Sequence, residues 1–392
     1  MASSLVTSDY EDEEGLHFVL KDVHFSVANA IRRTILSNIP IVVIRTEDSK
    51  INQCTIHVNT TRFHNEIVKQ RLSCIPICTK DITAFSQNYR LVLDVQNESS
   101  NELRWVTTDD FQIQHKQTEK FMDDIEKQKI FPHDVLSNKP IDFLRLRPSI
   151  SQNIAGEHIK LSADFSIATA SENGMFNVVS KISYHNVIDA EARENMWAIH
   201  LQTLKDESRT EKEIEFEKDN FMCLDAYRCF KVDDQGEANE FEFIVQSLGI
   251  YTNYEIVFQA CDFLENKFNT FIQSVQSQIV PIHESIHSRD LGYTSVIVST
   301  LDNSYDVILE KEDYTFGYLL EEYLFKLLFN EKEGSQIVFL GFKKYHPHDP
   351  YSVIRMAFKP NPSPSLLVKE YLIQASKEVA KTMNTLKNKF RK

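Results

Sequence analysis

The chain has 392 residues, enough for two or three domains with sizeable cores, and its hydrophobic content of 42% is ordinary for a globular protein. The formal net charge of −14 should make the surface as a whole repel nucleic acid, so we expect little direct nucleic acid contact. The sequence shows no secretory leader, its six cysteines do not suggest a disulfide framework, and no apolar run reaches the roughly 18 residues of a membrane span. These features indicate an intracellular protein rather than a membrane or secreted one.

An amphipathic helix is predicted near the N-terminus, after a flexible acidic tail (residues 1–14) and a first strand (15–25). Ser26 is a suitable N-cap, and Pro40 ends the helix. The β-branched run 41–44 then predicts a strand buried on both faces. The apolar face of the helix has residues at steps of three and four, namely Ala28, Ile31, Ile35 and Ile39.

Three polar residues, Asn29, Arg32 and Arg33, project from this helix away from its apolar face. Charged outer faces are usual on amphipathic helices, so one interpretation is a solvated surface. The other is a contact with a partner, because guanidinium groups are planar forks that suit carboxylates and carbonyls at an interface.

The middle of the chain, about 48–239, is less regular and predicts a mainly β insertion. Short runs with strand character are separated by polar segments. The strand-like runs are 89–95, 159–168 and 175–185, and they are followed by a helix-compatible stretch, 191–204, and a charged segment, 206–220, that is expected to be mobile.

The two ends of the chain follow the same plan of strand, helix, strand, strand and long helix. In the first half, a strand at 241–248 leads to a long helix with coiled-coil spacing. In the second half, strand-like runs at 337–342 and 353–358 precede a similar final helix, and Asp313 or Thr315 can cap the helix before them. The apolar positions of the two long helices include Val257, Cys261, Leu264, Phe268 and Val275, then Val368, Leu372, Val379 and Leu386.

Each long helix needs a partner for its apolar face. We therefore predict an α+β fold in which the two halves pack as an internal pseudo-dimer. The apolar face of each long helix, here called its seam, would cover that of the other. Two unrelated α+β domains on a linker are the alternative. The expected interface between the halves consists of Val257, Cys261, Leu264, Phe268, Phe316, Leu320, Leu372, Val379 and Leu386.

One short motif suggests a different class of protein. His283-Glu284-x-x-His287 has the spacing of a zinc hydrolase helix, in which two histidines hold zinc and the glutamate activates a water. It follows Pro281, in what looks like a connector, and no third ligand has a suitable spacing. Cys54, Cys74 and Cys78, with nearby histidines, lack the paired spacing of structural zinc sites. No catalytic residue, metal or cofactor is therefore predicted, and a zinc-dependent hydrolase is the alternative function.

The helix that carries Asn29-Ala30-Ile31-Arg32-Arg33 and ends before Pro40 resembles a family signature. It is similar to that of the alpha-like assembly subunits of multisubunit DNA-directed RNA polymerases, which include bacterial alpha, archaeal D and the third eukaryotic subunit. In the insertion, the residues similar to the family pattern are Phe63, Glu66, Ile67, Arg71, Leu72, Ile75 and Pro76.

The second half resembles the small alpha-like subunit, archaeal L or the eleventh eukaryotic subunit. The matching residues are Glu312 to Leu320, Gly341-Phe342 and His346-Pro347. Both subunits in one chain resemble the fused subunits of large DNA viruses, which implies the virion and host cytoplasm, with the nucleus as the alternative. The four-cysteine cluster of many cellular members is absent, and residues 190–238 match no family segment.

The resemblance implies a first dimerisation domain at 15–47 and 240–279, an insertion domain at 48–239, a connector at 280–292 and a second, small dimerisation domain at 293–392. It implies a non-catalytic assembly platform that recruits the second-largest catalytic subunit and then the largest. The small zinc-binding polymerase subunits are further expected partners. The residues expected to contact the second-largest subunit are Asn29, Arg32, Arg33, Glu66 and Arg71.

Overall fold

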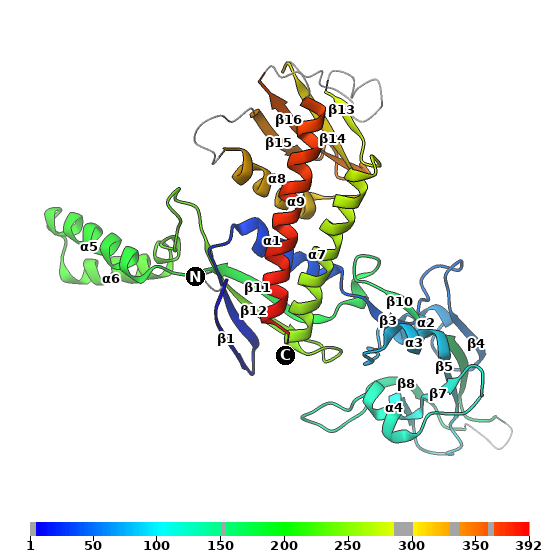
Figure 1. Cartoon of the computed structure of the whole chain (residues 1–392). Coiled ribbons are helices and arrows are strands. Elements are labelled where there is room, and N and C mark those ends of the chain that lie inside the picture. Colours follow the sequence, from blue (N-terminus) through cyan, green and yellow to red (C-terminus); the bar gives the residue numbers. More distant parts are fainter. Residues whose placement is uncertain (1–4, 150–153, 286–300, 330–336, 360–363, 392) are drawn as a thin grey trace. The chain divides into compact units, whose positions relative to one another are not determined.

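The structure is a computed structural model, and it describes residues 5–149, 154–285, 301–329, 337–359 and 364–391 (Figure 1). Its mixture of helices and strands confirms the α+β class. Two compact units divide the chain. The first unit comprises Met1–Ile35, Lys181–Gln246 and Asn253–Lys392, and the second comprises Leu36–Ser180 and Ser247–Thr252. Within the described ranges, every helix is too short or too polar to span a membrane.

The first unit contains a four-stranded sheet in the order β1-β2-β12-β11. Its core face carries Leu16, Phe18 and Leu20, all fully buried, and the Phe18 ring stacks on Phe243 at 4.8 Å. The strands are β1 (Val6–Asp12), β2 (Gly15–Lys21), β11 (Val179–Asn186) and β12 (Glu240–Ser247).

The expected flexible tail is wrong for residues 6–12, because these form β1, an edge strand antiparallel to β2. The turn between them depends on Gly15, whose φ of +122° is a conformation that side chains disfavour. A Cβ at this position would also lie 2.2 Å from the Val245 carbonyl oxygen. The acidic side chains of β1 are compatible with a strand because its outer face is exposed, while Tyr10 stacks on His17 at 4.6 Å.

A second four-stranded antiparallel sheet in the same unit has the order β13-β14-β16-β15. Helix α8 (Tyr314–Phe329) packs closely on it, because a Cβ at Gly317 would overlap the Phe342 ring of β15. Asp313 precedes α8, and its Oδ1 accepts the Thr315 N–H at 2.9 Å. The strands are β13 (Ile282–Glu284), β14 (Ser304–Glu310), β15 (Ile337–Lys343) and β16 (Tyr351–Phe358).

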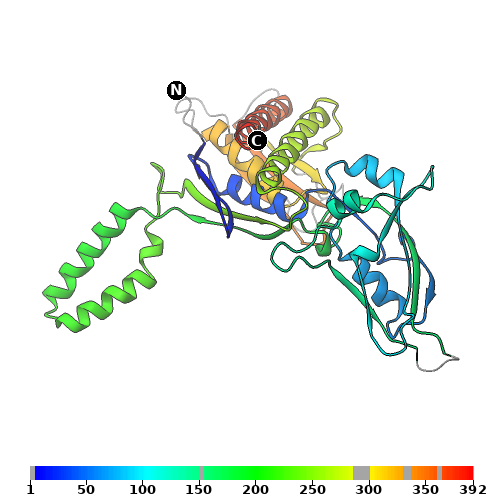
Figure 2. The same ribbon diagram turned by 90° about the horizontal axis from the view of Figure 1, so that it is seen from below.

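Two long helices, α7 (Asn253–Gln276) and α9 (Pro364–Lys389), pack side by side within the first unit, as Figures 1 and 2 both show. Near the end of α9, Lys387 Nζ lies 3.1 Å from Asp262 Oδ1 and 2.5 Å from Glu265 Oε2. Asn384 Nδ2 also donates to Glu265 Oε1 at 2.8 Å. Charged and amide groups therefore flank the apolar contact between the two helices.

The second unit is mainly β. Its largest sheet is antiparallel in the order β4-β9-β5-β7, and β3 (Ile41–Val43) pairs with β10 (Ser166–Ala168). The other strands are β4 (Cys54–Asn59), β5 (Tyr89–Gln96), β6 (Arg104–Thr107), β7 (Gln112–His115), β8 (Asp142–Leu146) and β9 (His158–Asp164). Its helices are α2 (Asn65–Ser73), α3 (Ile82–Asn88) and α4 (Asp124–Ile130).

The boundaries of this unit differ from those expected for an insertion at 48–239, because residues 181–239 group with the first unit. Those residues include α5 (Ala190–Asp206) and α6 (Glu211–Cys223). The expected mobile segment at 206–220 is wrong, since most of it is α6. A capping box explains the helix: the Glu213 carboxylate accepts both the N–H and the hydroxyl of Thr210, at 2.8 and 2.9 Å.

Candidate partner interface

Helix α1 (Phe25–Ser37) carries the residues on which the functional prediction depends. Its apolar face is buried as expected, with Ala28, Ile31 and Ile35 almost inaccessible. The predicted N-cap is wrong, because Ser26 lies inside the first turn of the helix. His24 takes that role: its Nδ1 accepts the Ser26 N–H at 3.2 Å.

Asn29 and Arg32 form one polar group on the partly exposed side of α1. Both Nε and Nη2 of Arg32 donate to Asn29 Oδ1, at 3.2 and 2.9 Å. Within the described part of the chain, Nη1 of Arg32 has no acceptor. Arg32 also lies close enough to β11 to influence Tyr184: burial raises the pKa of that phenol, and the arginine charge partly opposes the increase. The pair is thus held in place with donors left for another molecule.

Arg33 has an internal partner that the sequence analysis does not predict. Its Nη2 lies 3.0 Å from Asp313 Oδ2, and its Nε donates to Thr315 Oγ1 at 2.6 Å. Burial alone would raise the pKa of Asp313, but the hydrogen bond from the Thr315 N–H and the charge of Arg33 outweigh it and lower that pKa. Arg33 therefore joins α1 to the start of α8, which is 280 residues away in the sequence.

A cavity of about 570 Å³ lies at the start of α1, against α8. Its walls include Phe25, Glu322, Phe325 and Lys326. His24 Nε2 is 3.5 Å from Glu322, and burial lowers the pKa of His24 while this glutamate opposes the effect. Phe25 is 46% exposed, and Phe325 on the opposite wall is 43% exposed, so the cavity presents two accessible aromatic rings. Sequence reasoning missed Phe25, although it begins the helix that carries the family signature.

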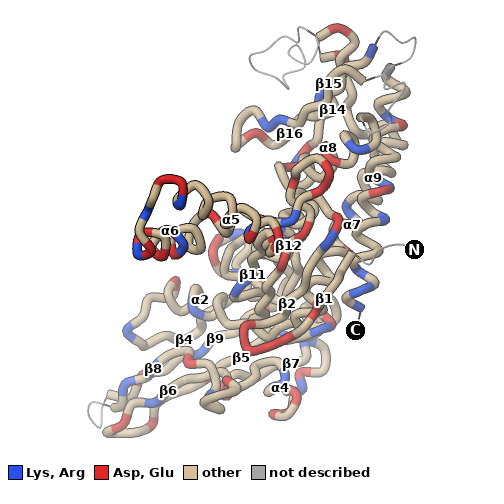
Figure 3. Tube along the Cα trace, turned by 90° about the vertical axis from the view of Figure 1, so that its left-hand side faces the viewer, with Lys and Arg blue, Asp and Glu red and all other residues tan. Residues whose placement is uncertain are grey.

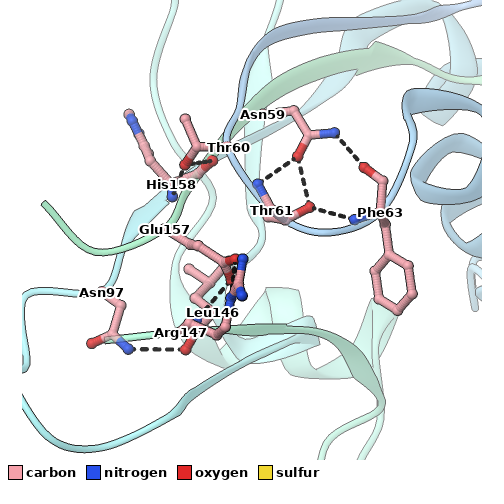
Figure 4. Close-up of polar contacts among 9 residues, drawn as sticks. All are labelled: Asn59, Thr60, Thr61, Phe63, Asn97, Leu146, Arg147, Glu157 and His158. Carbon is pink, nitrogen blue, oxygen red and sulfur yellow. Dashed lines mark hydrogen bonds and ion pairs between the residues drawn. The ribbon is translucent and has the colours of Figure 1, made fainter. Parts of the chain in front are cut away.

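Glu66 and Arg71 lie on α2 in the second unit, which is considered by itself. Glu66 is exposed, whereas Arg71 Nε donates to the Phe143 carbonyl oxygen at 2.8 Å and so helps to hold α2 on β8. The turn before α2 is fixed by Asn59, whose Nδ2 donates to the Phe63 carbonyl oxygen at 2.9 Å (Figure 4).

A second polar contact in Figure 4 joins Glu157 to Arg147. The buried Glu157 carboxylate accepts bonds from the N–H and Nε of Arg147, at 2.8 and 2.6 Å.

The residues expected at the interface between the halves are all buried in the first unit. The Phe268 ring of α7 stacks on Phe316 of α8 at 4.4 Å. Lys267 Nζ lies 2.7 Å from Glu312 Oε2, and burial nevertheless raises the pKa of Glu312 above its usual value. The other buried members are Val257, Cys261, Leu264 on α7, Leu320 on α8, and Leu372, Val379 and Leu386 on α9.

The proposed zinc motif does not have the geometry of a hydrolase helix. His283 and Glu284 lie in β13, where successive side chains point to opposite faces, while His287 lies outside the described residues. Among the residues that the structure describes, no three His, Cys, Asp or Glu side chains come together as metal ligands. Cys54 is a buried member of the apolar core of the second unit, and this burial raises the pKa of its thiol to about 11.

Comparison with known proteins identifies the family of the chain. Residues 17–268, well over half of the chain, match the RNA polymerase Rpb3/Rpb11 dimerisation domain, and the chain belongs to this family. A stretch of 67 residues is 37% identical to the DNA-directed RNA polymerase subunit Rpo3 of Pyrococcus furiosus. That match covers 17% of this chain and 23% of the relative, so the chain spans about a quarter of the length of the relative.

Proposed function

We propose that this protein is a non-catalytic assembly subunit of a DNA-directed RNA polymerase. One observation carries the proposal. The chain belongs to the Rpb3/Rpb11 dimerisation family, and its signature helix α1 holds the Arg32–Asn29 pair on its accessible side. The protein supplies a surface on which the catalytic subunits assemble. It does not supply reacting groups.

The first unit functions as an internal pseudo-dimer in this proposal. The packing of α7 against α9 supports it, because each helix covers apolar residues of the other. Arg33 with Asp313, and Lys267 with Glu312, add polar links between the two halves. A dimer within one chain removes the entropy cost of bringing two subunits together, so the platform needs no separate association step.

The second-largest polymerase subunit docks on α1 and the largest subunit follows. Arg32 offers donors to carboxylates or carbonyls of that partner, and the exposed Phe25 ring offers apolar contact area. Glu66 on α2 is a second candidate contact, and the small zinc-binding subunits are further partners.

The test is affinity purification of the tagged full chain from its native source. Two very large polymerase subunits in equal amounts support the proposal, and recovery of the chain without them contradicts it.

The substitution Arg32→Glu separates docking from folding. We expect at least a 30-fold loss of the catalytic subunits from the purified complex, which is the scale of an interface residue worth about 2 kcal/mol or more. The melting temperature should not change, because Arg32 bonds only to Asn29 among the described residues. Arg391→Glu changes an exposed arginine elsewhere and is the matched control. Normal recovery of the catalytic subunits with Arg32→Glu would show that Arg32 of α1 is not at the interface with them.

Arg33→Met tests the link between α1 and α8 and gives a pH-dependent result. In the folded state the pKa of Asp313 lies below its ordinary value of 3.8. The ionised carboxylate therefore contributes stability that is fully present above about pH 4 and is lost as the pH falls through the pKa of the folded state. We expect Arg33→Met to lower the free energy of unfolding by up to about 1 kcal/mol near pH 7. In urea titrations this difference should shrink on acidification towards pH 3. A difference that stays constant with pH would show that Asp313 is not the relevant partner.

A further inference from the structure

Helices α5 and α6 form a helical arm, residues 189–230, which lies almost entirely within 190–238, the stretch in which no motif of the family is found. The chain enters it from β11 and leaves it towards β12, and the two helices lie side by side in Figures 1 and 2. At its base, the Asp189 N–H donates to the Cys229 carbonyl oxygen at 2.9 Å. The arm is therefore an insertion between β11 and β12 whose two ends are hydrogen-bonded to each other.

The arm has a small core of its own. The Trp197 ring of α5 lies 5.3 Å from Phe221 of α6, and Leu204 and Phe221 are buried. Cys229 Sγ lies 3.5 Å from Met196 Sδ. These contacts hold α5 against α6, so the outward surfaces of both helices are fixed in position rather than averaged over many conformations.

Large apolar side chains lie on those outward surfaces. Ile199 of α5 is 71% exposed and Phe216 of α6 is 65% exposed, and Tyr227, in the short turn Ala226–Arg228 after α6, is 68% exposed. Residues 195–204 of α5 contain no charged side chain. Such a concentration of exposed apolar groups on one small element is typical of a surface that another molecule covers.

Charge restricts what that molecule can be. Helix α6 carries five carboxylates and two lysines, and most of the carboxylates face solvent; Figure 3 marks them along the helix. Nucleic acid and anionic membranes would be repelled by this helix. A second copy of the arm would bring like charges together. A protein surface with apolar residues bordered by Lys and Arg is complementary to both helices. Its apolar residues would cover the uncharged stretch of α5, and its Lys and Arg would pair with the carboxylates of α6.

We propose that the arm is a docking site for a basic protein surface, an interaction separate from assembly through α1. Ile199 and Phe216 supply the apolar contact, while Glu215 and Asp219, one helical turn apart on α6, attract the basic residues. The proposal goes beyond the polymerase function and does not depend on it.

The experiment places a photo-reactive phenylalanine analogue at position 199 of the tagged full chain, expressed in its native source. The analogue at position 136 is the control, because Leu136 is an apolar residue in the second unit that is even more exposed, at 97%. We expect Ile199 to give cross-links, absent from position 136, to Lys- and Arg-rich protein segments. A synthetic peptide of the cross-linked segment is then titrated against the full chain without the analogue.

Charge reversal decides between specific docking and non-specific adhesion. We expect Glu215→Lys with Asp219→Lys to weaken binding of that peptide at least about tenfold, and the neutral pair Glu215→Gln with Asp219→Asn to weaken it less. The control pair Glu98→Lys with Glu370→Lys makes the same change of net charge at exposed positions elsewhere. Cross-links to nucleic acid, lipid or a second copy, equal yields at positions 199 and 136, or peptide binding that ignores the charge reversal would each overturn the proposal. Circular dichroism and thermal unfolding check that each variant keeps the helical content and stability of the natural protein.

Discussion

Leu372→Asp is expected to unfold the first unit or to lower its free energy of unfolding by at least about 4 kcal/mol. Leu372 lies on α9, fully buried where this helix packs against α7 and α8. The substitution removes a buried leucine side chain and places an unpaired carboxylate in its position. Because a domain has only about 5–15 kcal/mol of total stability, this change removes much of it.

Lys377→Asp is the matched control, since Lys377 lies on the same helix with its side chain exposed. Thermal unfolding followed by circular dichroism at 222 nm gives the comparison. The control variant should melt within a few degrees of the natural protein. A Leu372→Asp variant with an unchanged melting temperature would show that α9 is not held in the seam, and would end the pseudo-dimer proposal.

Arg355→Met should be the second most damaging of these changes. Asp306 lies on β14 directly opposite Arg355 of β16, and its completely buried carboxylate accepts bonds from Nε and Nη2 of Arg355 at 2.6 and 2.8 Å. Ser285 Oγ donates to the same carboxylate at 2.7 Å. Without the guanidinium, a buried negative charge loses its counter-ion, and such losses cost about 3–5 kcal/mol.

The double variant Asp306→Asn with Arg355→Met identifies the cause. It removes both charges but keeps an oxygen that can accept the Ser285 hydroxyl, so we expect it to recover at least half of the lost stability. Urea denaturation of the three proteins measures the difference. If the double variant is as unstable as Arg355→Met, the loss comes from the missing packing of the arginine side chain rather than from an unpaired charge.

The local elements of the fold could be predicted because their signals are short-range. The steps of three and four residues in α7 and α9 arise from the helical period, so each apolar face was predictable without knowledge of its partner. The capping box at Thr210 and Glu213 is equally local, and attention to it would have corrected the prediction of a mobile segment there.

The contacts of the candidate site could be predicted only in part. The signature helix, with Asn29 and Arg32 on one side, follows from its sequence, because residues three apart are neighbours on a helix. The role of Arg33 does not, since Asp313 and Thr315 come from a distant segment. The same limit applies to Phe25, whose exposure beside α8 depends on how the two halves pack.

The sequence by itself thus determined the α+β class, the helix faces, the repeated plan and the family signature, all of which depend on periodicity or on residues close together in the chain. Only the tertiary structure decided that β1 is an edge strand, that residues 181–239 belong with the first unit, and that Arg33 binds across the two halves. The reason is physical. Local propensities are encoded within a few residues, whereas a long-range pair forms only if burial elsewhere offsets the entropy of closing the chain between its members.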